Sequence, residues 1–198
     1  MFSLILFGKT RLSDTEIDEI LCYEEGTTSD VLSGLHSLVV FEPGQPIRIH
    51  HTSLYDYLTS TRCDESWYID TDLEKSKIVS RCFGLMKNRL RFNICDLETS
   101  FKFNRDVPDL EKRVNERIHS GLLYSCRHWA SHLRDVPYSD ELLSELDNFV
   151  YNQLLHWVEI LSLTKRLHPF LGSTLKNALE WIEVRHQSIN TDVELTFE

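Results

Sequence analysis

The spacing of apolar positions divides the chain into a short mixed part and a long helical part. Apolar residues three and four apart dominate, whereas strand-like alternation occurs only around residues 38–51. This alternating run surrounds a turn at Pro43-Gly44 and predicts a β-hairpin with a short loop. The chain is therefore predicted to be mostly α-helical with one small β-hairpin.

Two short amphipathic helices are predicted before the hairpin. The first begins at a capping box formed by Ser13 and Glu16, and the second runs from about residue 29 to residue 38. A further helix follows the hairpin. Two helices, a hairpin and a closing helix follow in the order of a winged-helix domain, which we place at residues 1–69.

A polar stretch at residues 60–72 separates this domain from the rest of the chain. Three apolar residues interrupt it, and we expect them to dock onto one of the flanking domains: Trp67, Tyr68 and Ile69. The domain boundary is therefore placed near residue 70.

The second part, residues 70–198, is predicted to be an all-helical bundle because it carries helical spacing and no convincing strand. Asp106 and Pro108 are placed at the start of one of its helices. A break is predicted at residues 169–173, where a proline and a glycine interrupt the pattern.

His51 stands where the alternating run becomes helical. Alternation places it with Ile47 and Ile49 on the buried face, and Ser53 with Asp56 predicts a helix start that resembles a capping box. A helix N-terminus attracts anions and disfavours a positive charge nearby. A neutral His51 could therefore donate an N–H to a phosphate oxygen; the alternative is a histidine that only packs and caps the junction.

The composition disfavours several classes of function. The chain has 31 acidic and 21 basic residues, a net charge of -10, which argues against general nucleic-acid binding because that requires a basic surface. The 5 cysteines are scattered, which is typical of a reduced cytoplasmic protein. No signal peptide or membrane span is predicted. Phosphate-binding glycine motifs and nucleophile–base arrangements are not found in the sequence, so we predict a protein without catalytic residues or a bound cofactor.

Two weaker candidates remain in the helical part. His128 and His132 have metal-ligand spacing and lie near Cys126, but no third ligand can be named, so we expect them on a polar helix flank and predict no metal site. The second candidate is a small basic cluster of Lys87, Arg89 and Arg91. We interpret it as a solvated helix end; the alternative is a contact with an anion or an acidic partner.

Several strings, in order, resemble one protein family: LSDTEIDEIL (12–21), HTSLYDYL (51–58), LRFNICDL (90–97), YSCRHWASHL (124–133) and LLHWVEILSL (154–163). They are similar to the region that follows the NACHT ATPase core in fungal STAND proteins, which are NACHT/WD-repeat proteins related to heterokaryon-incompatibility factors. The resemblance covers about residues 4 to 165.

The resemblance implies a role for His51. In this family the winged helix closes over the nucleotide, and the histidine of an H-x-S-[FL]-x-[DE]-[FY] motif is expected to touch the β-phosphate of ADP. That motif falls on His51, Ser53, Asp56 and Tyr57, with Leu54 where phenylalanine is more usual. The resemblance therefore favours a nucleotide-sensing His51 over a purely structural one.

The family's phosphate-binding loop, magnesium-binding motif and repeats are not found in this sequence, so we expect a fragment whose N-terminal element is truncated. ADP or ATP would be reached only through a NACHT domain outside this chain. The leading hypothesis is a non-enzymatic regulatory module of a STAND-type signalling NTPase. The alternatives are a helical adaptor that binds protein partners and a winged-helix DNA-binding protein.

Overall fold

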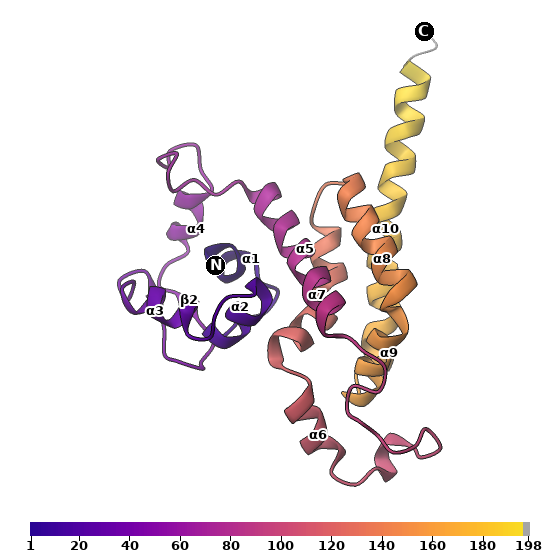
Figure 1. The fold of residues 1–198 in the computed structure, drawn as a ribbon. Helices are drawn as coiled ribbons and strands as arrows, with labels where there is room; N and C mark the ends of the chain where they lie inside the picture. The colour runs from indigo at the N-terminus through magenta and orange to yellow at the C-terminus, as the bar shows by residue number, and fades with distance from the viewer. Residues whose placement is uncertain (196–198) are drawn as a thin grey trace.

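The structure, a computed structural model, describes residues 1–195, with side chains described as far as Glu183. Within this range the chain is mostly helical, with ten α-helices, one 3-10 helix and one two-stranded antiparallel sheet (Figure 1). The α-helices are α1 (Phe2–Phe7), α2 (Asp14–Leu21), α3 (Thr27–Ser33), α4 (Ser53–Leu58), α5 (Thr71–Arg89), α6 (Leu110–Arg117), α7 (Ser120–Arg134), α8 (Asp140–Asn152), α9 (Leu154–Leu163) and α10 (Leu167–Leu195). The other elements are β1 (Val39–Val40), β2 (Arg48–Ile49) and the 3-10 helix η1 (Asn104–Asp106). The predicted fold class, mostly α-helical with one small β-hairpin, is confirmed.

Helix α2 begins at the predicted capping box. The Ser13 N–H donates to Glu16 Oε2 over 2.8 Å, and the Glu16 N–H donates to Ser13 Oγ over 3.3 Å. Its apolar face is buried through Ile17 and Ile20. Both the start of α2 and its buried face are therefore confirmed.

Helix α3 begins earlier than predicted, because the Asp18 side chain of α2 sets its start, and it also ends earlier. The buried Asp18 carboxylate accepts hydrogen bonds from the N–H groups of Gly26 and Thr28, each over 2.9 Å, so α3 begins at the glycine turn. It ends at Gly34. The predicted range 29–38 is therefore wrong at both ends.

The predicted hairpin is confirmed in a shorter form. Val39 lies opposite Ile49 and Val40 opposite Arg48 in an antiparallel pair. Val39 is buried and Val40 is exposed, as the alternation of strand side chains requires. Helices α2 and α3, the hairpin and α4 follow one another in the predicted order; their assignment to the winged-helix fold stays a prediction.

The helical part surrounds a cluster of aromatic rings. The ring centroid of Trp129 in α7 lies 4.9 Å from that of Phe149 in α8 and 6.0 Å from that of Trp157 in α9. The Trp157 indole N–H donates to the Cys126 carbonyl over 2.7 Å, which satisfies this buried donor. Figure 1 shows α5 and α7 at the centre of the molecule and α10 extending away from it.

Polar contacts join the first part of the chain to α7. The Gly121 N–H donates to Glu19 Oε2 over 2.8 Å, and the Lys9 N–H donates to the Tyr124 hydroxyl over 3.0 Å. The Lys9 ammonium also forms an ion pair with Asp135. One hydrophobic core extends from Leu4 to Trp181 across both parts. The boundary near residue 70 stays a prediction.

Two further predicted helix boundaries are wrong. Helix α6 begins at Leu110, not near Asp106, because the residue before Pro108 is held extended and separates η1 from α6. The break at 169–173 does not occur, since α10 continues through it. Pro169 is the third residue of α10, where a backbone N–H needs no partner within the helix.

Candidate functional site

The candidate site lies at the junction of β2 and α4, where His51 is exposed to solvent. The expectation that His51 shares a buried face with Ile47 and Ile49 is wrong. Ile47 is buried and Ile49 is half-buried, but β2 ends at Ile49, so the alternation of the strand does not reach His51.

The His51 ring is held by Ser53. The Ser53 N–H donates to His51 Nδ1 over 3.0 Å, and the Ser53 hydroxyl lies 2.8 Å from the same nitrogen. A backbone amide is always a donor, so Nδ1 is the acceptor and the neutral ring carries its proton on Nε2. The junction therefore presents a hydrogen-bond donor, Nε2–H, on an exposed ring whose orientation Nδ1 sets.

The start of α4 differs from the predicted capping box. Thr52 precedes the helix and makes no side-chain cap, and Ser53 is the first helical residue rather than the N-cap. The His51 ring takes over this role because it accepts the free Ser53 N–H. Of the three residues that accompany His51 in the motif, Ser53 is hydrogen-bonded to the His51 ring. Asp56 and Tyr57 are exposed and lie further along α4.

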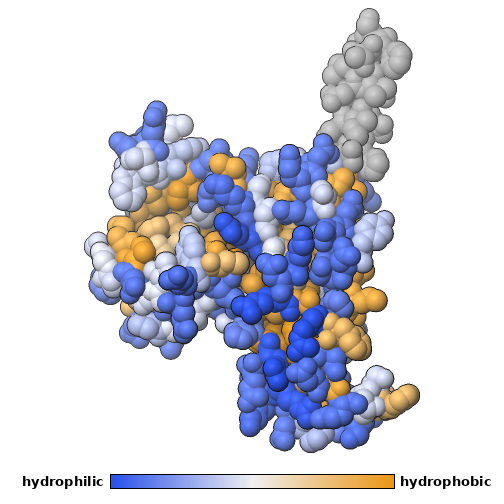
Figure 2. All heavy atoms as spheres, in the orientation of Figure 1, coloured by the Kyte–Doolittle hydropathy of each residue, from blue (hydrophilic) through white to orange (hydrophobic). Residues whose placement is uncertain are grey.

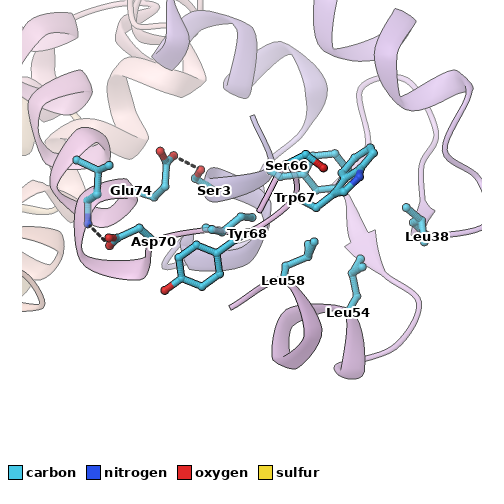
Figure 3. A pocket seen from close by; sticks show the side chains of 12 residues that line it. Ser3, Leu38, Leu54, Leu58, Ser66, Trp67, Tyr68, Asp70 and Glu74 are labelled. Atoms are coloured by element: carbon cyan, nitrogen blue, oxygen red, sulfur yellow. Dashed lines mark hydrogen bonds between the residues drawn. The ribbon is translucent and has the colours of Figure 1, made fainter. Parts of the chain in front are cut away.

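A groove lies beside α4 and has a cavity volume of about 390 Å³ (Figure 3). Leu54 and Leu58 of α4 contribute to it, together with side chains from α1 and α5 and with Leu38, the residue before β1. Trp67 and Tyr68 also line it, with 66% and 47% of their surface exposed, so the expectation that they dock onto a flanking domain is wrong. Ile69 does pack against the core, and its N–H donates to the Leu58 carbonyl over 2.8 Å.

The two histidines of α7 are not on a polar flank. His132 is only 2% exposed, and its Nε2 lies 2.8 Å from the Tyr124 hydroxyl. That hydroxyl accepts the Lys9 N–H, so its own proton points to His132. Burial lowers the pKa of His132 to about 3 and that of His128 to about 4, and both rings are neutral at pH 7. Among the residues with described side chains, no three His, Cys, Asp or Glu residues are placed to hold a metal ion.

The remaining candidates are the buried cysteines and the basic cluster. Burial raises the pKa of the Cys82 thiol to about 12 and also raises that of Cys126, so neither thiol is a nucleophile at pH 7. In the basic cluster, Arg91 lies 3.0 Å from Asp96 and donates to the carbonyl of Ile94. Lys87 and Arg89 are exposed.

The groove and the buried Tyr124–His132 pair were not predicted. The three apolar residues in the polar stretch at 60–72 were the sequence signal for the groove, but periodicity could not tell exposure from docking.

No family model, curated protein or solved structure matches this chain. The described helices include none that is long and apolar enough to cross a lipid bilayer.

Proposed function

We propose that this chain is a non-enzymatic regulatory module of a STAND-type signalling NTPase. It closes over a nucleotide that a NACHT core outside the chain holds, and His51 contacts the β-phosphate of ADP. The observation that carries this proposal is the His51 ring, which is exposed and whose Nδ1 accepts the Ser53 N–H. The Nε2–H that remains is the donor that a phosphate oxygen requires.

The proposed mechanism is a shift between a closed and an open arrangement. A ligand shifts such an equilibrium only by its difference in affinity for the two states, and here that difference is the contact made in the ADP state. A hydrogen bond to a charged group is worth about 1.5–3 kcal/mol, which corresponds to roughly a tenfold to hundredfold bias toward the closed state. Exchange of ADP for ATP would release it.

The contacts between the first part of the chain and α7 support transmission of this closure. Glu19 of α2 accepts the Gly121 N–H, and Lys9 is bonded to both Tyr124 and Asp135. Because these bonds accompany a continuous hydrophobic core, movement of the His51 junction would carry the helical part with it. In this proposal the helical part transmits the movement of the His51 junction when the nucleotide changes.

The test is ADP release from a full-length NACHT protein that carries this region. Replacement of the residue equivalent to His51 by alanine is expected to increase the ADP dissociation rate at least tenfold and to make signalling constitutive. The matched control is His50→Ala, since His50 is also exposed but its Nε2 lies 2.9 Å from the His36 carbonyl. Unchanged ADP release in the His51 variant would refute the sensing role.

The alternative function is a helical adaptor that binds protein partners. Strongly exposed large apolar side chains of the helical part favour it, among them Phe92 (78%), Tyr151 (85%) and Leu155 (80%). A winged-helix DNA-binding function has less support because α3, residues Thr27–Ser33, carries no lysine or arginine. A salt-dependent mobility shift with duplex DNA would favour it.

A further inference from the structure

The groove beside α4, called here the α1–α4 groove, presents unfilled apolar surface. Trp67 is 66% exposed, Leu73 53%, Tyr68 47% and Leu38 37%, and all four line it. Its volume of about 390 Å³ lies within the range of ligand-binding clefts. Figure 2 shows apolar surface gathered in a hollow on this side of the molecule. Contiguous exposed apolar surface of this kind marks interaction sites.

The groove is bordered by negative charge. Most of its lining belongs to residues 56–74. The sequence of that segment has one basic residue, Arg62, and six acidic residues: Asp56, Asp64, Glu65, Asp70, Asp72 and Glu74. Asp70 and Glu74 lie in the wall itself, where Asp70 caps α5 and Glu74 is bonded to Ser3 and Lys77 (Figure 3).

The carboxylates outside the wall are open to solvent. Asp56, Asp64, Glu65 and Asp72 are all exposed, and the positive charge of Lys77 offsets only Glu74. A partner that covers the groove therefore meets an apolar floor and an excess of negative charge at its border. Lysine and arginine side chains suit this border, since their stems add apolar contact while their heads reach the carboxylates.

We propose that the α1–α4 groove binds an amphipathic helix of a partner protein, with apolar side chains at i, i+3, i+4 and i+7 and with lysine or arginine on the flanks. The walls are faces of α1 and α4, the segment 66–70 and the first turn of α5, so the groove offers apolar side chains rather than an open sheet edge. Helix-in-groove binding is the recognition mode that fits such walls. This inference does not rest on the proposed sensing role of His51.

The charge excess makes a measurable prediction about salt. Complementary charges accelerate association, and added salt screens this attraction over about 8 Å at physiological ionic strength. A helix with lysine flanks is expected to bind about tenfold more tightly than the same helix with glutamate flanks at low salt. Its affinity should fall several-fold as salt is raised.

The experiment uses the full 198-residue chain and two fluorescein-labelled helical peptides of about four turns. Both peptides carry leucine at i, i+3, i+4 and i+7; one has lysine flanks and the other glutamate flanks. Fluorescence polarisation is measured at low and high salt. Trp67→Ala and Leu73→Ser, both at exposed positions, should each weaken binding of the lysine peptide about tenfold. Glu65→Gln combined with Asp72→Asn should reduce its salt dependence.

Phe101→Ala is the matched control, because Phe101 is 97% exposed and does not line the groove. Circular dichroism confirms that each variant keeps its helical content. Three outcomes would overturn the proposal: equal affinity for the two peptides, unchanged binding in both groove variants, or no binding of the lysine peptide. Concentration-dependent dimerisation that Trp67→Ala abolishes would also overturn it, because the occupant would then be a second copy of the chain.

Discussion

The buried histidine of α7 predicts a loss of stability in mild acid. His132 is 2% exposed, and its Nε2 lies 2.8 Å from the Tyr124 hydroxyl. Burial lowers its pKa to about 3, and the nearby Lys9 ammonium acts in the same direction, while Asp135 opposes it. We expect His132→Gln to remove a large part of the pH dependence of the unfolding free energy between pH 7.5 and pH 5.

The sign follows from where the proton binds. The unfolded chain binds a proton at His132 near the ordinary pKa of 6.5, whereas the folded chain does so only near 3. The stabilising contribution is therefore fully present above pH 6.5 and is lost as the pH falls through 6.5 toward 3. At pH 5 the loss is about 2 kcal/mol, and it reaches about 5 kcal/mol below pH 3, because one pKa unit corresponds to 1.36 kcal/mol.

The assay is urea unfolding followed by circular dichroism at pH 7.5 and pH 5. Wild type should lose about 2 kcal/mol more than His132→Gln between the two pH values, since contributions from carboxylates and from His128 are common to both proteins and cancel. Glutamine keeps a polar group beside Tyr124 but does not titrate. The folded variant therefore reports titration rather than loss of packing.

Tyr124→Phe is the matched control. It removes the hydroxyl next to His132 but leaves the histidine buried, so stability should fall by about 1–3 kcal/mol at both pH values with little change in pH dependence. Equal pH dependence in wild type and His132→Gln would refute the reasoning. It would mean that His132 is hydrated or protonated in the folded chain.

Other contacts make further predictions. Asp18→Ala leaves two backbone N–H groups at the start of α3 unpaired, and urea unfolding should show a loss of about 2–4 kcal/mol. Gly121→Ala places a Cβ 2.6 Å from Glu19 Oε2, where α2 and α7 meet. It should lower the unfolding free energy measured in urea by about 1–3 kcal/mol. Cys82 and Cys126 are fully buried, so a thiol reagent should label them only after unfolding; labelling of both in the folded chain would contradict their burial.

Local signals in the sequence predicted part of the helical structure. The Ser13–Glu16 box predicted the start of α2, because this signal involves residues close in sequence. Apolar spacing likewise predicted a helical second part, in which α7 buries Trp129 and Leu133. Prolines were less informative, since Pro169 is tolerated in the first turn of α10.

The candidate site was only partly predictable. The sequence identified His51 and Ser53 as a pair at a strand-to-helix junction, but it assigned the cap to Ser53 and a buried face to His51. The structure reverses both assignments, because β2 ends two residues before His51 and its ring accepts the Ser53 N–H. The chemical role of His51 as a nucleotide sensor stays a prediction.

The sequence by itself determined the fold class, the capped start of α2 and the short hairpin, because hydrogen bonds and side-chain periodicity within a few residues control them. Only the tertiary structure decided which apolar and ionisable residues are covered. His132 is buried beside Tyr124, whereas Trp67 is left in an open groove. These outcomes depend on where α1, α4 and α7 lie relative to one another, and residues distant in the chain set that arrangement.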